Sequence, residues 1–172
     1  MEDVRMPKFT PIAVDTNVLL DLAAKDELVI DCLATISKRI SNSGIIVLPT
    51  VILELREIVK SGARAEKLFA TTALVSMLDP WGFRPVNCIP AGHGIVEQIA
   101  RKIRSKGLIP EEEIHDSFIV AEAALYGVTI LISNDGHIKN IDQPMLKIEL
   151  DSSDVDCPLI ASPWKIARQF FQ

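Results

Sequence analysis

Short hydrophobic runs alternate along this chain with segments whose apolar residues recur every three or four positions. The short runs are rich in β-branched residues and are closed by turn-forming residues, which is typical of buried strands. The segments between them have the spacing of helices that bury one face. Strands are predicted to end at Asp15 and to cover residues 45–48 and 129–132, with a further short strand at 146–150 and at most a short one around 86–89.

Capping and helix-breaking residues predict the helix boundaries. Thr50 is placed to cap a helix that begins at Val51, and Pro110 is placed to open a helix that ends at Gly127. The predicted helices cover residues 18–41 in one or two pieces, 51–61, 64–77, 95–105, 110–126 and, with a Ser-Pro start, a terminal helix at 162–171.

The alternation of strands and helices predicts an α/β fold, a three-layer α/β/α sandwich with a central, mostly parallel sheet. The chain has 172 residues, which suits a single domain over 1–172. The loop at 79–94 is rich in proline and glycine but is not distinct enough to divide it. Hydrophobic residues make up 48% of the sequence and aromatic residues 5%, so we expect an aliphatic core.

Charge and cysteine usage narrow the class of protein. The formal net charge of −5 argues against a broad nucleic-acid-coating surface but leaves room for a local phosphate site. Cys32, Cys88 and Cys157 are far apart and odd in number, so neither a disulfide framework nor a zinc site is predicted. The chain has no apolar run of membrane-spanning length and opens with acidic residues, so we expect a cytoplasmic protein with no membrane partner.

Four acidic side chains stand at related places in this pattern. Asp15 and Asp135 come just after two of the predicted strands. Glu54 lies in the first turns of the helix after the second strand, and Asp116 shares a helical stripe with apolar side chains. Parallel strands end at one edge of a sheet, where the following helices begin, so we expect these acids to converge there.

Each acid also has an ordinary structural interpretation. Asp15 could cap the next helix, and Asp116 could be a first-turn residue that interacts with the helix dipole. Glu54 could pair with basic neighbours on a solvated face, and Asp135 could belong to a simple Asn-Asp-Gly turn. Four clustered carboxylates would repel one another without a cation. Hard oxygen ligands select Mg²⁺ or Mn²⁺, so one or two such ions are predicted.

Two stretches of the sequence resemble the PIN domain family of metal-dependent nucleases. The first is Val-Asp-Thr-Asn-Val-Leu-Leu around Asp15, and the second is His-Asp-Ser-Phe-Ile-Val-Ala-Glu-Ala-Ala-Leu-Tyr-Gly-Val-Thr-Ile-Leu-Ile-Ser-Asn-Asp, which ends at Asp135. The resemblance covers about residues 10–140 and leaves the remainder as a C-terminal extension. By position, it implies four catalytic and metal-binding acids, Asp15, Glu54, Asp116 and Asp135. It also implies two polar residues that orient waters or a phosphate oxygen, Asn17 and Ser133.

The resemblance also implies an activity. It points to an Mg²⁺- or Mn²⁺-dependent endoribonuclease that hydrolyses RNA phosphodiester bonds, in which the metal lowers the pKa of a water molecule and stabilises charge on the phosphate. Two alternatives stay open, namely the toxin of a type II toxin–antitoxin pair, with an antitoxin as protein partner, and a catalytically weak scaffold that binds another protein. A homodimer is a further alternative, since such domains often pair.

Basic side chains form two groups that could contact RNA. The first, on the helices at 51–61 and 64–77, is interspersed with acids and is expected to be a solvated face. The second has no acid within it and is the predicted RNA-binding group: Arg101, Lys102, Arg104 and Lys106. His115 and His137 are expected to have surface or packing roles, because neither has the second ligand that a histidine metal site needs.

Overall fold

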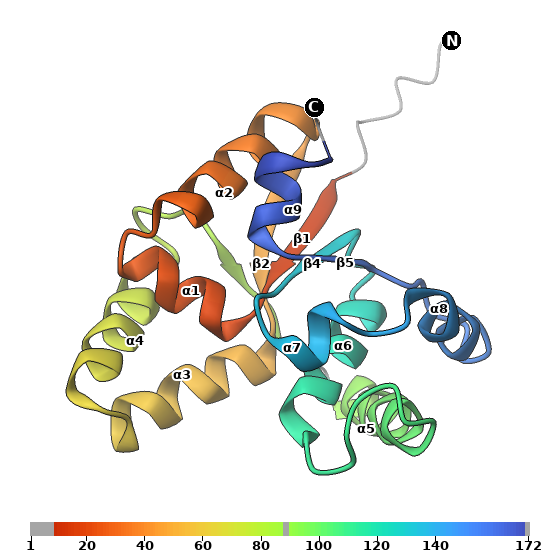
Figure 1. The fold of residues 1–172 in the computed structure, drawn as a ribbon. Helices are drawn as coiled ribbons and strands as arrows, with labels where there is room; N and C mark the ends of the chain where they lie inside the picture. Colours follow the sequence, from red (N-terminus) through yellow and green to blue (C-terminus); the bar gives the residue numbers. More distant parts are fainter. Residues whose placement is uncertain (1–8, 88–89, 171–172) are drawn as a thin grey trace, which may run out of the picture.

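The computed structural model describes residues 9–87 and 90–170 (Figure 1). Five strands form one sheet in the order β3-β2-β1-β4-β5, and each neighbouring pair is parallel. The strands are β1 (Thr10–Val14), β2 (Ser43–Val47), β3 (Arg84–Pro85), β4 (Ile130–Ile132) and β5 (Leu159–Ala161). The helices are α1 (Thr16–Ala23), α2 (Glu27–Arg39), α3 (Pro49–Ser61), α4 (Arg64–Ser76), α5 (Pro90–Ser105), α6 (Ile114–Leu125), α7 (Gly136–Lys139), α8 (Gln143–Asp151) and α9 (Pro163–Arg168).

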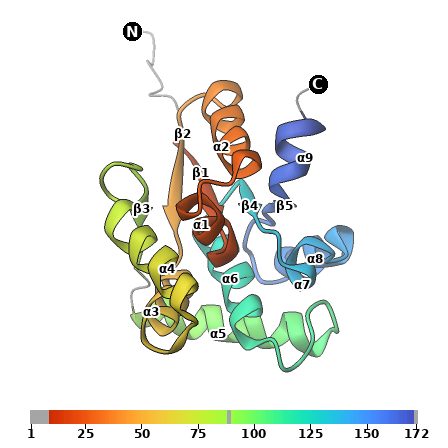
Figure 2. The ribbon, with the colours of Figure 1, turned by 60° about the vertical axis from the view of Figure 1, so that its left-hand side comes forward.

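Helices cover both faces of this sheet (Figures 1 and 2). The chain moves outward from β1 to β3 through α1–α4, then returns across the sheet to β4 and β5 through α5–α8. Because such crossovers are right-handed, the two sets of helices lie on opposite faces. Helix α9 packs beside α2 on the first face, while α5 packs beside α6 and α8 on the second. This arrangement confirms the predicted three-layer α/β/α fold, with all five described strands parallel.

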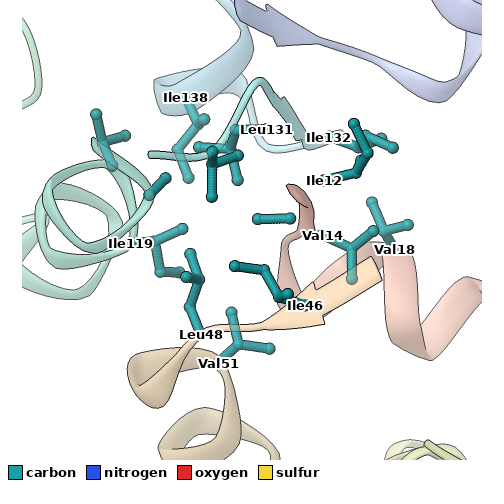
Figure 3. Packing of buried hydrophobic residues seen from close by; sticks show 14 of the residues in the cluster. Ile12, Val14, Val18, Ile46, Leu48, Val51, Ile119, Leu131, Ile132 and Ile138 are labelled. Carbon is teal, nitrogen blue, oxygen red and sulfur yellow. The ribbon is translucent and has the colours of Figure 1, made fainter. Parts of the chain in front are cut away.

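The core lies between the sheet and its helices and is almost wholly aliphatic, as predicted (Figure 3). Strands β1 and β4 are buried on both faces, which explains why they read as continuous hydrophobic runs in the sequence. Side chains from the sheet meet side chains from helices on both sides, and the figure labels Ile12, Val14, Val18, Ile46, Leu48, Val51, Ile119, Leu131, Ile132 and Ile138.

One predicted strand is wrong. Residues 146–150 belong to helix α8, in which Leu146 and Leu150 are both buried one helical turn apart. The helix is started by Asp142, whose carboxylate accepts a hydrogen bond from the Met145 N–H at 3.0 Å. The fifth strand is instead β5, whose short Leu-Ile-Ala run the sequence pattern did not single out.

Several predicted boundaries also move. Helix α3 begins at Pro49, so Thr50 lies inside the helix instead of capping it. Helix α6 begins at Ile114, because the Glu113 N–H closes a turn on the Pro110 carbonyl oxygen at 3.0 Å.

The remaining differences are smaller. The predicted helix at 18–41 is two helices, α1 and α2. The short strand β3 precedes the predicted 86–89 segment, of which residues 88–89 lie outside the described residues. Helix α5 begins at Pro90, before the predicted start at residue 95. Helix α9 ends at Arg168, and residue 171, the predicted end, lies outside the described residues.

Two further observations bear on the sequence predictions. Cys32 is buried and Cys157 is half-buried, and neither forms a disulfide, while Cys88 lies outside the described residues. Within the described parts of the chain, no helix combines the length and the apolar character needed to cross a bilayer.

Candidate active site

A cleft of about 410 Å³ lies at the edge of the sheet where β1 and β4 end and where α1, α3 and α6 approach each other. The four predicted acids, Asp15, Glu54, Asp116 and Asp135, all line it, and so does Asn17. The residues described along the cleft include no lysine or arginine, and His115 is the only basic side chain among them. The structure therefore brings the predicted acidic constellation together.

Asp15 is the most enclosed of these acids, with 3% of its surface exposed. It caps α1 by accepting a hydrogen bond from the Thr16 N–H at 2.6 Å, and it accepts another from the Ser133 hydroxyl at 2.6 Å. The pKa of Asp15 is raised from 3.8 to about 6, mainly by burial and to a smaller extent by the charges of Glu54 and Asp135. Both hydrogen bonds act in the opposite direction and lower this pKa. Asp15 is thus both the cap of α1 and a buried acid of the cleft whose charged form is disfavoured.

Ser133 joins two of the cleft acids through one hydroxyl group. Its Oγ donates to Asp15 and accepts a hydrogen bond from the Asp135 N–H at 2.9 Å. Asp135 in turn caps α7 by accepting from the His137 N–H at 2.7 Å. The end of β4 is therefore tied to the end of β1, and the Asp135 backbone is held beside the carboxylate of Asp15.

Asn17 holds the neighbouring loop. Its side-chain oxygen accepts a hydrogen bond from the Asn134 N–H at 3.3 Å, and its amide lies 3.4 Å from a carboxylate oxygen of Asp15. The Asn134 side chain also donates to Asp21 on α1 at 3.3 Å. These contacts all reach protein groups, so the orienting role of Asn17 toward a water or a phosphate stays a prediction.

Glu54 comes from α3 and meets α1 and α6 in the cleft. It accepts a short hydrogen bond from the Thr16 hydroxyl. Its other oxygen lies 3.3 Å from Nδ1 of His115, the residue before Asp116. This histidine also lines the cleft. The structure therefore places Glu54 in the cleft, as the sequence predicted, and adds Thr16 as its partner. The predicted surface or packing role of His115 stays a prediction.

The pKa of Asp116 is raised further than that of Asp15. The Asp116 pKa is raised from 3.8 to about 7, first by burial and then by the negative charges of Asp135 and Asp15. Glu113 and Glu54 add smaller contributions in the same direction. The carboxylates therefore repel one another near neutral pH, as their clustering predicts.

The sequence model of the PIN domain family matches residues 12–144, most of the chain and all four acids. The chain belongs to the PIN domain family. PIN domains are generally nucleases and typically use divalent metal ions. The family assignment confirms the resemblance found in the sequence.

Solved structures support the same fold for this PIN domain. VapBC2 from Rickettsia felis, bound to a DNA fragment from their promoter, aligns with a TM-score of 0.61 and 16% identity over 89% of this chain and 98% of that chain. FitAcB from Neisseria gonorrhoeae aligns with a TM-score of 0.54 and 19% identity, with coverages of 89% and 98%. FitAB bound to an IR36 DNA fragment aligns with a TM-score of 0.53 and 17% identity over 89% of this chain and 95% of that chain. No curated protein sequence matches the chain.

The donor chemistry of the cleft fits a hard divalent cation. Its acids offer carboxylate oxygens, which Mg²⁺ and Mn²⁺ prefer. Burial and neighbouring negative charges raise the pKa values of Asp15 and Asp116, and no lysine or arginine lines the described wall of the cleft. Between residues 9 and 170, apart from 88–89, no three histidine, cysteine, aspartate or glutamate side chains are grouped closely enough to hold an ion in this conformation. Metal binding therefore stays a proposal.

The predicted RNA-binding group on α5 does not line the cleft, and each member has an acidic neighbour. Lys102 and Lys106 both lie beside Glu149 of α8, at 3.6 and 3.9 Å. Arg101 pairs with Glu97 at 3.2 Å. The Arg104 side chain is 11% exposed and donates to Ser117 at 2.6 Å, with Glu111 at 3.9 Å. These pairings fasten α5 to its neighbours, and contact with RNA at this group remains a prediction.

A buried acid outside the cleft was also missed. Glu122 of α6 is 3% exposed and accepts hydrogen bonds from both the N–H and the hydroxyl of Thr50, at 3.1 and 2.7 Å. It therefore supplies the start of α3 with the acceptor that this helix lacks at its own cap, Leu48. The sequence did contain one indication of this buried acid, because Glu122 is a charged residue among the apolar positions of α6.

We expect the chelator-treated protein to lose stability as the pH rises from about 4 to about 7. Asp15 and Asp116 have raised pKa values in the folded state, so the folded protein binds more protons than the unfolded chain in this window. Below this pH window both carboxyl groups are protonated in the folded and the unfolded states. Above it both are charged, and their full repulsion destabilises the folded protein. Thermal unfolding at pH 5 and pH 8 should show a lower Tm at pH 8.

Asp116→Asn provides the control for this pH effect, because it keeps the shape of the side chain without the charge. We expect it to reduce the fall in Tm between pH 5 and pH 8. An equal fall in the parent and the variant would show that the cleft carboxylates do not cause it.

Proposed function

We propose that this PIN domain is a ribonuclease that hydrolyses RNA phosphodiester bonds with the help of one or two Mg²⁺ or Mn²⁺ ions. The observation that carries the proposal is the convergence of four carboxylates, from two strand ends and two helices, in one open cleft without a lysine or arginine along its described wall. A purely structural cluster of this kind would destabilise the protein, as the raised pKa values of Asp15 and Asp116 indicate.

The four cleft acids would hold the cation through carboxylate oxygens: Asp15, Glu54, Asp116 and Asp135. When bound, the cation supplies Lewis-acid stabilisation of the charge that develops on the attacked phosphate. The surrounding residues hold these acids in place. Ser133 and the Thr16 N–H fix Asp15, the Thr16 hydroxyl fixes one oxygen of Glu54, and the Ser133 hydroxyl positions the Asp135 backbone.

Water adds across the P–O bond, so hydrolysis leaves a phosphate on one RNA end and a hydroxyl on the other. The chain's contribution is positioning, because an attack in line with the leaving oxygen needs the phosphate and the water held together. Asn17 and His115 line the same cleft and can donate hydrogen bonds to phosphate oxygens.

The test is cleavage of unstructured RNA by the purified protein with Mn²⁺ or Mg²⁺, compared with excess chelator. Cleavage that the chelator stops, and that the double variant Asp15→Asn, Asp116→Asn lacks although it folds, is the expected result. A folded double variant that cleaves RNA as fast as the parent would overturn the proposal.

The toxin of a toxin–antitoxin pair is a second candidate, favoured by the similar solved structures of VapBC2 and FitAB bound to DNA. In this case the nuclease is the same, and a small antitoxin partner blocks it. Growth arrest on expression in bacterial cells, absent for Asp116→Asn, would support this candidate. Unimpaired growth with active soluble protein would leave a ribonuclease outside such a pair.

A further inference from the structure

A second hollow, of about 200 Å³, lies beside the candidate active site at the same edge of the sheet. It is lined by Lys139 and Asn140 from the end of α7 and by Ser162, Trp164 and Lys165 from the start of α9. Ser162 directly follows β5, just as Asp15 directly follows β1. Because β5 is the parallel neighbour of β4, the hollow lies about one strand spacing, roughly 5 Å, along the edge from the strand that leads to Asp135.

Helix α7 connects the two places directly. Asp135 caps its first turn on the cleft side, and Lys139 is its last residue on the side of the hollow. Four helical residues span only about 6 Å, so a chain bound at one place can reach the other within a few nucleotides. Figure 1 shows α7 following β4 and α9 following β5 at this edge.

The chemistry of the hollow is the reverse of that of the cleft. Lys139 and Lys165 are exposed, no ion pair is recorded for either among the described residues, and no acid lines the hollow. Asp135 and Asp142 are the nearest acids along the chain to Lys139, and they cap α7 and α8 instead. In a chain of net charge −5, this combination marks a local site for anions.

Trp164 gives this site a flat apolar surface. Its side chain is 51% exposed although it is one of only two tryptophans in the sequence. A half-exposed indole that shares a hollow with two exposed lysines matches the way proteins bind single-stranded nucleic acid, with a base stacked on the ring and phosphates held by cations. Asn140 can add hydrogen bonds to a base edge or to a ribose hydroxyl.

We infer that Lys139, Trp164 and Lys165, with Asn140, form a subsite that binds single-stranded RNA next to the acidic cleft. This inference rests on the proposed function for its choice of ligand. It separates substrate binding from the α5 basic group, whose side chains are engaged with Glu97, Glu111 and Glu149. The hollow holds one part of the strand while the acids act on a phosphate further along.

The subsite is tested by binding in excess chelator, so that cleavage does not enter the measurement. Trp81→Phe leaves Trp164 as the sole tryptophan, and an oligouridylate of about ten nucleotides is titrated into this protein. We expect saturable quenching of the Trp164 fluorescence. Trp164→Ala, followed by anisotropy of a labelled oligouridylate, should weaken binding roughly 5- to 150-fold.

The lysines are tested through salt dependence. Lys139→Gln with Lys165→Gln should weaken binding at least tenfold and should lower the slope of log affinity against log salt by about 1.4, since each phosphate contact to a single strand contributes about 0.7. Lys38→Gln with Lys67→Gln removes the same charge from α2 and α4 and should leave the slope unchanged.

The other outcomes overturn the inference. Equal binding by the lysine pair variant and its control, or no quenching of Trp164, would show that RNA does not occupy the hollow. Tighter binding of deoxyuridylate than of oligouridylate would exclude RNA as its ligand. In each case the metal-dependent cleavage assay still decides the proposed function, because that assay does not depend on these side chains being the binding site.

Discussion

Asp116→Asn is expected to lower the rate of RNA cleavage by about 1,000-fold while the protein remains folded. Asp116 lies in the cleft with Asp15, Glu54 and Asp135, and burial together with the negative charges of these neighbours raises its pKa to about 7. Removal of one carboxylate weakens the site for a cation whose stabilisation of phosphate charge is worth several kcal/mol. The rate is measured under single-turnover conditions with saturating Mn²⁺, and Mn²⁺ affinity is measured by calorimetry on the same two proteins.

Glu113→Gln is the matched control for Asp116→Asn. It also removes one negative charge from the beginning of α6, but Glu113 pairs with His137 at 3.5 Å and is not among the residues that line the cleft. We expect this variant to keep the parent rate within about threefold, because Glu113 adds only a minor part of the negative charge felt by Asp116 and does not line the cleft. Cleavage by Asp116→Asn within the same range would remove Asp116 from the catalytic machinery.

Glu122→Ala is expected to lower the free energy of unfolding by about 3 kcal/mol, which corresponds to roughly 6–12 °C in Tm for a chain of this size. Its carboxylate accepts from the Thr50 N–H and the Thr50 hydroxyl in the interior, at 3.1 and 2.7 Å. The substitution leaves these donors without that partner and opens a cavity between α6 and the start of α3. Chemical denaturation and calorimetry measure the loss.

Glu66→Ala makes the same chemical change at an exposed place. Glu66 accepts a hydrogen bond from the Ala63 N–H at 3.1 Å and thereby serves the start of α4, as Glu122 serves α3. We expect a loss of about 1 kcal/mol or less, since water can replace an exposed cap. Similar losses for the two variants would mean that burial of the Glu122 contact adds nothing to stability.

The fold could be predicted from the sequence wherever local pattern and burial agree. Strands β1, β2 and β4 are central, so their hydrophobic runs are unmistakable. The five residues from Leu146 to Leu150 alternate like a strand, yet the two leucines also lie one helical turn apart, and the Asp142 cap decides between these periods. Strand β5 has only three residues, too few for a period to emerge.

The sequence predicted those features of the site that follow from the order of strands and helices. Strand ends and helix starts were enough to bring the four acids to one edge. The partners that hold them come from distant elements, as Glu122 of α6 does for Thr50 of α3, and one sequence contains no signal for such pairs. No acid lies between Arg101 and Lys106, but Glu97, one turn earlier on α5, pairs with Arg101 and could have been seen in the sequence. Glu149 of α8 and Glu111 lie beside the group only in space.

The hydrogen bond from Ser133 to Asp15 spans 118 residues of chain, and β1 pairs directly with β4. Because the chain is synthesised from its N-terminus, this separation delays the assembly of the cleft. Translation adds about 5–20 residues per second, so β1 emerges roughly 6 to 24 seconds before the strand that completes its edge. Until then Asp15 has neither the Ser133 hydroxyl nor Asp135 beside it. The growing polypeptide therefore stays without an assembled acidic cleft while it is still attached to its own messenger RNA for most of its synthesis.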